Sequence, residues 1–147
     1  MPGPRILVIE DNILNLELVT DLLVDAGYEV VAAGSAEEGI RRAHTDAPAL
    51  ILMDIALPGM DGLAAARVLK ADPATAPVPI VALSAHTMKG DEERARAAGC
   101  AGYIAKPIDT RRLASRVRRF LGGEGTEPPG RGPQSGAAGG SAEGRDR

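Results

Sequence analysis

The 147-residue chain has very few of the side chains that build disulfides or aromatic cores. Its single cysteine, Cys100, excludes an intramolecular disulfide. Tryptophan is absent and aromatic residues make up only 2% of the chain, whereas hydrophobic residues make up 44%. A core therefore has to be built from Ala, Val, Ile and Leu, which suits helices packed tightly on a sheet. The length fits one domain with one such core.

Long apolar runs and a large net charge are also missing. No stretch approaches the ~18 consecutive apolar residues of a membrane span. The start of the chain has no apolar signal-peptide region, so we expect a cytoplasmic protein. The formal net charge of −3 is too small to favour nucleic acid or a membrane as a bulk electrostatic partner.

What the chain does have is an alternation of strand and helix patterns. Unbroken apolar runs at Ile6–Ile9, Leu50–Asp54 and Ile80–Leu83 are typical of strands buried on both faces. Tyr28–Ala33 and Ala101–Ala105 are further strand candidates, the first of them at an edge. A helical pattern follows each of the five runs. This alternation predicts an α/β fold with a five-stranded parallel sheet and helices on both faces.

The predicted helices have recognisable starts, ends and apolar faces. We expect Asn12 to cap the first helix, Gly27 to end it, Ser35 to open the second and Asp109 to cap the last. The residues of the first helix expected to face the core are Leu14, Leu18, Val19, Leu22, Leu23 and Ala26. Those of the last helix are Leu113, Val117, Phe120 and Leu121.

The end of the chain differs in composition from the rest. Gly and Pro occupy 12 of the 26 positions in 122–147, and no branched aliphatic or aromatic residue occurs there. Such a segment cannot bury enough surface to offset its ordering entropy. The sequence therefore predicts one domain over 1–121 and a disordered tail over 122–147.

Polar side chains stand where the predicted strands end, and in parallel sheets ligands bind at that edge. Glu10 and Asp11 follow the first strand, Asp54 ends the third, Ser84 ends the fourth and Lys106 follows the fifth. Three carboxylates gathered there would repel one another unless a hard divalent cation such as Mg²⁺ binds. An ammonium and a hydroxyl beside them are donors for an anion. Together these groups predict a phosphoryl-transfer site.

The same residues carry a resemblance to a known family. Residues 6–121 resemble the receiver domain of two-component response regulators, a flavodoxin-like (βα)5 fold of the CheY-like superfamily. The motifs in register are Val8-Ile9-Glu10-Asp11-Asn12, Met53-Asp54, Leu57-Pro58-Gly59-Met60-Asp61-Gly62, Ser84-Ala85 and Lys106-Pro107. The stretch Met88–Arg94, with Gly99-Cys100 and Tyr103-Ile104, further resembles single-domain regulators of the DivK type.

The resemblance implies a role for each matching residue of the site. Asp54 matches the aspartate that attacks a phosphohistidine and becomes an acyl phosphate. Glu10, Asp11 and Asp54, with the main-chain carbonyl of Ala56, match the groups that hold Mg²⁺. Lys106 matches the lysine that pairs with the phosphoryl oxygens, and Lys106-Pro107 matches a peptide that is usually cis. The protein would then be a switch that takes up and loses a phosphoryl group, not an enzyme with a separate substrate.

The resemblance also implies how the signal leaves the site. Ser84 matches the switch hydroxyl, more often Thr in the family, and Tyr103 the aromatic residue that turns inward with it. The arginines of the last helix, among them Arg112, Arg116 and Arg119, are either a solvated face or the surface that binds a downstream protein. The phosphodonor would be a histidine kinase or a histidine phosphotransfer protein. DNA binding is not expected, because residues 1–121 hold 14 basic and 16 acidic side chains.

Several alternative functions are compared with these expectations. A receiver of this kind could serve as a phosphate sink or be the detached receiver of a hybrid kinase. A phosphatase with an aspartyl-phosphate intermediate would place a second acid two residues after the nucleophile, where this chain has Ala56. A flavodoxin-like cofactor binder would not have an acidic first loop, which repels phosphate. Ala56 and His86 line the family's route for hydrolytic water, and they leave the lifetime of the phosphorylated state open.

Overall fold

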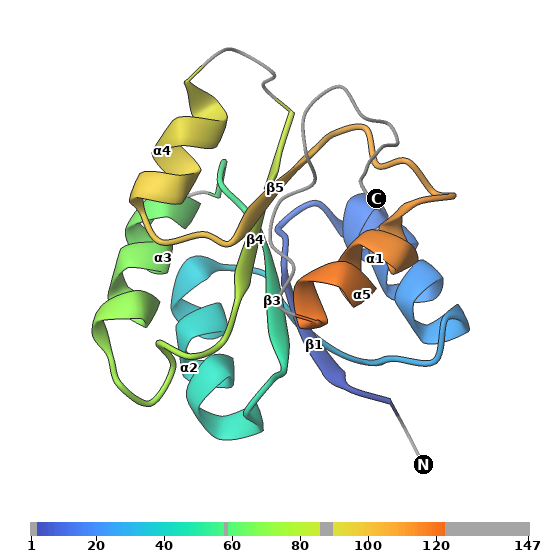
Figure 1. Ribbon diagram of the computed structural model, residues 1–147, viewed down its shortest axis with the longest axis horizontal. Helices are drawn as coiled ribbons and strands as arrows, with labels where there is room; N and C mark the ends of the chain where they lie inside the picture. The colour runs from blue at the N-terminus through green and yellow to red at the C-terminus, as the bar shows by residue number, and fades with distance from the viewer. Residues whose placement is uncertain (1–2, 58, 86–89, 123–147) are drawn as a thin grey trace, which may run out of the picture.

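Five parallel strands alternate with five helices in the computed structural model, which describes residues 3–57, 59–85 and 90–122 (Figure 1). The strands are β1 (Arg5–Ile9), β2 (Glu29–Ala33), β3 (Leu50–Asp54), β4 (Ile80–Ser84) and β5 (Gly102–Ala105). The helices are α1 (Ile13–Asp25), α2 (Ala36–Asp46), α3 (Gly62–Ala71), α4 (Asp91–Ala97) and α5 (Leu113–Leu121). The predicted α/β alternation is confirmed.

The sheet has the strand order β2-β1-β3-β4-β5, with every neighbouring pair parallel. The chain runs from β1 outward to β2, then returns past β1 to build β3, β4 and β5. The order therefore reverses between β1 and β3, where ligand sites of such sheets form. Ile9 is in register with Met53, so the residues that follow them, Glu10 and Asp54, leave the sheet side by side.

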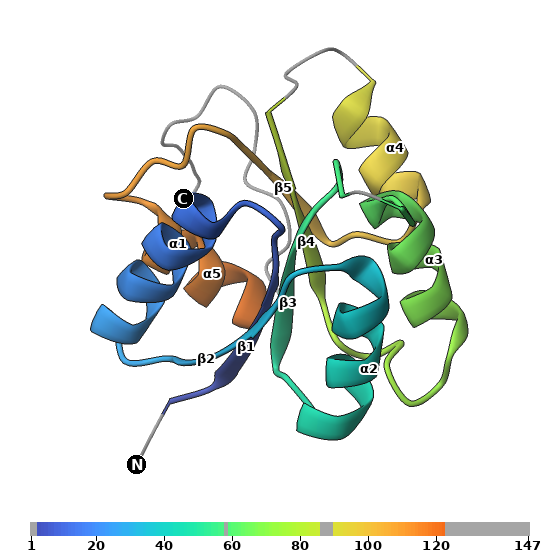
Figure 2. The ribbon, with the colours of Figure 1, turned by 180° about the vertical axis from the view of Figure 1, so that it is seen from behind.

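Helices cover both faces of the sheet, because apolar side chains of the strands point to both faces and need apolar partners there. Helices α1 and α5 lie on one face, and α2, α3 and α4 lie on the other (Figures 1 and 2). Alternate residues of β1 point to opposite faces, so Ile6 packs with α1 and α5, and Leu7 packs with α2, α3 and α4. The two apolar layers fix the sheet between them and hold the strand ends in place.

Most predicted helix ends are confirmed. The side chain of Asn12 accepts a hydrogen bond from the Asn15 amide at 3.0 Å, and Ser35 Oγ accepts one from the Glu38 amide at 3.1 Å. Gly27 has φ 99°, the left-handed conformation that ends α1. A cap that was not predicted is Asp61, whose side chain opens α3 by accepting from the Ala64 amide at 2.8 Å.

Two helix predictions are wrong in part. Leu14 and Leu18 were expected in the core, but their exposed fractions are 76% and 38%, and Ala26 is exposed as well. The apolar residues of α1 are spread too widely around the helix for one side to bury them all, and Val19 and Leu23 make its buried contact. Asp109 does not cap α5, because its side chain accepts from the Arg111 amide and opens a turn before the helix.

Some predictions lie outside the described residues. These include the predicted tail beyond residue 122 and the role of His86. Within the described ranges, every helix is too short or too polar to cross a membrane.

We predict that Gly102→Ala destabilises the protein. A Cβ at Gly102 would overlap the ring of Phe120, the buried aromatic residue through which α5 packs on β5. Overpacking of this kind costs about 1–3 kcal/mol, which urea unfolding would measure. Gly34→Ala is the matched control, because an added Cβ there meets nothing within 4 Å. Equal stabilities of the two variants would contradict the predicted packing.

Candidate functional site

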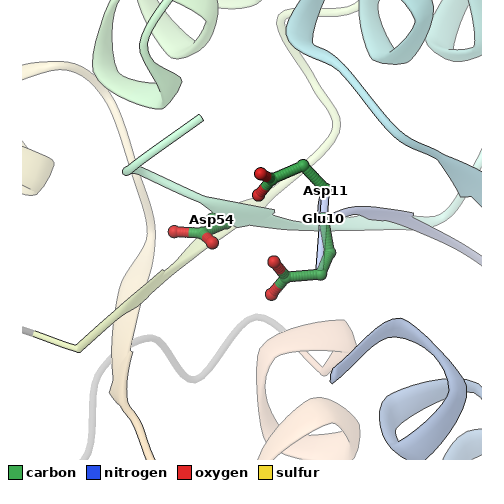
Figure 3. Close-up of side chains that lie close together, drawn as sticks. All are labelled: Glu10, Asp11 and Asp54. Carbon is green, nitrogen blue, oxygen red and sulfur yellow. The ribbon is translucent and has the colours of Figure 1, made fainter. Parts of the chain in front are cut away.

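Three carboxylates gather at the ends of the two neighbouring strands β1 and β3 (Figure 3). Glu10 and Asp11 follow β1 directly, and Asp54 is the last residue of β3. One oxygen from each side chain lies within 4.8 Å of the others. The strand register explains this convergence, because it brings both chain segments out of the sheet at the same height.

Two of these carboxylates are buried, and a lysine lies between them. Glu10 is 1% exposed and Asp54 is 5% exposed, whereas Asp11 is exposed. Lys106 Nζ donates to Glu10 Oε1 at 2.7 Å and to Asp54 Oδ2 at 2.8 Å. Buried carboxylates cost several kcal/mol unless donors meet them. The ammonium that follows β5 therefore offsets the burial of both acids at once.

Main-chain amides satisfy the remaining oxygens of the buried pair. The Asn12 amide donates to Glu10 Oε2 at 3.1 Å, and the Ala56 amide donates to Asp54 Oδ1 at 2.9 Å. Each of the four oxygens thus accepts one hydrogen bond. This fixes the orientation of the Asp54 carboxylate before any ligand binds, as a nucleophile requires.

Burial and hydrogen bonds shift the pKa values of the three buried groups of the site. Burial would raise the pKa of Asp54, but hydrogen bonds from Lys106 and the Ala56 amide outweigh it, so the pKa lies below its usual value. Burial raises the pKa of Glu10, and its bond to Lys106 only partly opposes this. Burial would lower the pKa of Lys106, but its bonds to Asp54 and Glu10 raise it. Asp54 is therefore ionised and Lys106 charged at neutral pH.

The donor set fits a hard divalent cation. The three oxygens are carboxylate oxygens, which Mg²⁺ prefers. Glu10, Asp11 and Asp54 together carry more negative charge than the one ammonium of Lys106 neutralises. The site thus has acidic ligands for a cation and a lysine for an anion beside it.

The other predicted site residues lie on the two strands beyond Asp54. Ser84 ends β4 and is fully buried, and its carbonyl accepts from the Lys106 amide at 2.7 Å. The Lys106-Pro107 peptide is cis, as the resemblance implied. Tyr103 lies in β5 and is half-buried against the core on the side of α4. The structure therefore places all five predicted strand-end side chains at one edge of the sheet.

Sequence reasoning missed two kinds of contact. The amide donors of Asn12 and Ala56 were not predicted, because a main-chain N–H leaves no trace in the residue type. The bond from Arg116 Nη2 to the Tyr103 carbonyl, 3.1 Å long, was also missed. The sequence indicates either a solvated face or a partner surface for Arg116, whereas the structure shows that it joins α5 to β5.

Comparison with known sequences finds a family model and relatives that match most of this chain. The family model of the response regulator receiver domain matches residues 6–118. The polar-differentiation response regulator DivK of Brucella ovis is 42% identical over 117 residues, which cover 80% of this chain and 95% of that protein. The DivK of Brucella anthropi is 41% identical with the same coverage. These relatives contain little beyond the matched region.

Solved structures show the same architecture. The receiver domain of a sensor histidine kinase from Pseudomonas aeruginosa PAO1 has a TM-score of 0.76 and 35% identity, covering 82% of this chain and 98% of that one. That structure has a magnesium ion coordinated in its active-site cleft. The chemotaxis response regulator CheY4 of Vibrio cholerae has a TM-score of 0.75 and 26% identity, covering 79% and 97% of the two chains.

We predict that Lys106→Met lowers the free energy of unfolding by about 3 kcal/mol at pH 7, because it leaves two buried carboxylates without their cation. In the wild-type protein the pKa of Asp54 in the folded state lies below its value in the unfolded state. Ionised Asp54 therefore stabilises the fold at pH values above the unfolded-state pKa, and this contribution is lost as the pH falls through the folded-state pKa. Without the ammonium, the pKa values of Asp54 and Glu10 rise, and the carboxylates become neutral more easily as pH falls. The loss should therefore be smaller at about pH 5.

Urea unfolding at both pH values measures this effect. Lys70→Met is the matched control, because the Lys70 ammonium donates to the carbonyls of Ala76 and Val78 and, among the described residues, to no carboxylate. Its cost should be the same at both pH values. A pH-independent cost for Lys106→Met would contradict the assigned role of the lysine.

Proposed function

Because this chain belongs to the response regulator receiver domain family, we propose that Asp54 is the residue that takes up the phosphoryl group. Phosphorylation on an aspartate with Mg²⁺ is general for this family of two-component signalling proteins. The observation that carries the assignment is the environment of Asp54. It is a buried, ionised carboxylate at the end of β3, with a lysine on one oxygen and two further acids beside it.

The proposed reaction transfers a phosphoryl group from a phosphohistidine to Asp54. A carboxylate oxygen of Asp54 attacks phosphorus, the phosphorus–nitrogen bond breaks, and the imidazole leaves with the bonding electron pair and takes up a proton. Lys106 donates to the incoming phosphoryl oxygens, and the Ala56 amide keeps the carboxylate oriented. The donor is a histidine kinase or a histidine phosphotransfer protein, as two-component signalling implies.

We assign the magnesium ligands to Glu10, Asp11, Asp54 and the main-chain carbonyl of Ala56. The convergence of three carboxylate oxygens within 4.8 Å supports the first three. The ion would neutralise charge between the carboxylates and the phosphoryl group. The Pseudomonas receiver with magnesium in its active-site cleft supports the same location here.

The signal is proposed to leave the site through Ser84, Tyr103 and α5. Ser84 is buried one strand away from Asp54, and Tyr103 lies in the next strand, β5. A phosphoryl group on Asp54 would attract the Ser84 hydroxyl, and Tyr103 would follow into the vacated space. The Tyr103 carbonyl is bound by Arg116, so a shift of β5 reaches α5 directly.

The output surface is proposed to include Arg112, Arg116 and Arg119. At 100° per residue these three side chains share the flank of α5 that the Arg116–Tyr103 bond turns toward β5. Their partner would be a downstream protein, and the chain would act as a switch, not as an enzyme or a DNA-binding protein. We place the domain at residues 1–121, which includes the whole matched region.

A second function, as the receiver of a hybrid kinase or a phosphate sink, has weaker support. Receivers of sensor histidine kinases are among the similar structures, at 31% and 35% identity. The DivK relatives are more similar, at 42% identity, and nearly their whole length is matched. We therefore favour a switch of the DivK type.

We predict that the protein gains one acid-labile phosphoryl group when it is incubated with a small phosphodonor and Mg²⁺, as mass spectrometry would show. Asp54→Asn should abolish the gain, because the amide is not a nucleophile, and a chelator should suppress it. Asp61→Asn is the matched control, because Asp61 lies in the loop after β3 but only caps α3. Phosphorylation of Asp54→Asn at the wild-type rate would exclude the assigned residue.

We predict that beryllofluoride, an acyl-phosphate mimic, changes amide hydrogen exchange in β5 and α5. The change should be lost in Ser84→Ala, because that variant keeps the Asp54 site but lacks the switch hydroxyl. Phosphoryl uptake at Asp54 should persist in this variant. Wild-type exchange changes in Ser84→Ala would show that the signal takes another route.

A further inference from the structure

Helix α3 begins with Gly62, a residue type that weakens a helix relative to alanine. The backbone at this position does not require glycine, because the φ angle of Gly62 lies outside the left-handed region. Gly59 differs in this respect, because its φ angle is 77°. Gly62 is also buried. The space around Gly62 therefore explains its missing side chain.

Gly62 lies directly against the main chain at the end of β3. A Cβ added to Gly62 would lie 2.6 Å from the Cα of Ile55, and closer still to the carbonyl oxygen of Asp54. Both are main-chain atoms, which cannot turn aside as a flexible side chain can. At Gly39 of α2, by contrast, the three atoms nearest to an added Cβ would all belong to the side chain of Ile9. A methyl group on residue 62 would therefore force α3 and the end of β3 apart.

Both α3 and β3 are held in place by their neighbours. Strand β3 lies between β1 and β4, and the Ile55 amide just beyond β3 donates to the Leu83 carbonyl at 3.0 Å. Helix α3 packs on the core through residues with no exposed surface, namely Ala65, Ala66 and Leu69. Close-packed contacts of this kind resist displacement. The displacement would therefore fall on the chain that connects β3 to α3.

The start of this connection carries an amide donor of the site. The Gly62 amide donates to the Ile55 carbonyl at 3.2 Å, so the connection is closed at the place where the methyl group would intrude. Ala56 follows Ile55 directly and is exposed, so few contacts oppose its displacement. The Ala56 amide donates to Asp54 Oδ1 at 2.9 Å. A shift at Ile55 therefore reaches the Asp54 carboxylate through Ala56.

We propose that Gly62 is a positioning residue, whose lack of a side chain keeps the Ala56 amide on Asp54 and so fixes the orientation of the nucleophile. This role depends on the proposed phosphoryl uptake at Asp54. The other carboxylate oxygen accepts from Lys106 Nζ at 2.8 Å, so the two donors together hold the plane of the carboxylate. Without the Ala56 donor, the carboxylate turns more freely about its Cβ–Cγ bond. A small misplacement of a reacting group lowers a rate by up to about a hundredfold.

Amide hydrogen exchange of Ala56, followed by NMR, tests the proposed contact. In the wild-type protein this exposed amide should exchange at least about tenfold more slowly than an unprotected amide, because it is hydrogen-bonded. In Gly62→Ala this protection should fall about tenfold or be lost. Gly102→Ala is the matched control, because its added Cβ overpacks the ring of Phe120 and not the main chain of β3. It should leave the exchange of Ala56 unchanged.

The rate of phosphoryl uptake provides a second measurement. With a small phosphodonor and saturating Mg²⁺, Gly62→Ala should take up the phosphoryl group about tenfold more slowly than the wild type. Gly102→Ala should keep the wild-type rate, because its overpacking leaves the Asp54 carboxylate oriented. Urea unfolding of both variants would verify that the rates are measured on folded protein.

Three results would each overturn the proposal. They are a wild-type Ala56 amide that exchanges like an unprotected one, a folded Gly62→Ala protein with wild-type exchange and rate, and a Gly102→Ala protein as slow as Gly62→Ala. The wild-type measurement does not require Gly62→Ala to fold. Failure of the proposed function is distinct, because then the wild type itself would gain no phosphoryl group at Asp54, while the exchange of Ala56 would still report the contact.

Discussion

The structure depends on one lysine between two buried carboxylates. Lys106 arrives from the end of β5 and bonds Glu10 from β1 and Asp54 from β3. Without it, the two acids would repel each other in a site that excludes most water. The sheet order makes this possible, because β1 and β3 are neighbours and β5 lies at the edge beyond β4. A fold that places these three ends together can keep an ionised aspartate ready for chemistry.

The same constraint connects the site to the surface. Phosphorylation would add negative charge where Lys106 already balances two acids, so the nearest donors must rearrange. Ser84 is buried on the adjacent strand, and β5 carries both Tyr103 and, just beyond its end, Lys106. Because Arg116 binds the Tyr103 carbonyl, α5 is attached to the strand that the chemistry would move. The proposed output flank of α5 is therefore connected to Asp54 through β5.

The sequence by itself determined the alternation of strands and helices, the caps at Asn12 and Ser35, and the polar side chains at the strand ends. These features depend on local periodicity and residue type, which every stretch of chain displays on its own. Only the tertiary structure decided which apolar residues of α1 are buried, and that Asn12 and Ala56 supply amides to the carboxylates. It also decided that Lys106 bonds both acids and Arg116 bonds β5. Such contacts join residues far apart in the chain, so they depend on strand order and helix orientation, which local pattern does not encode.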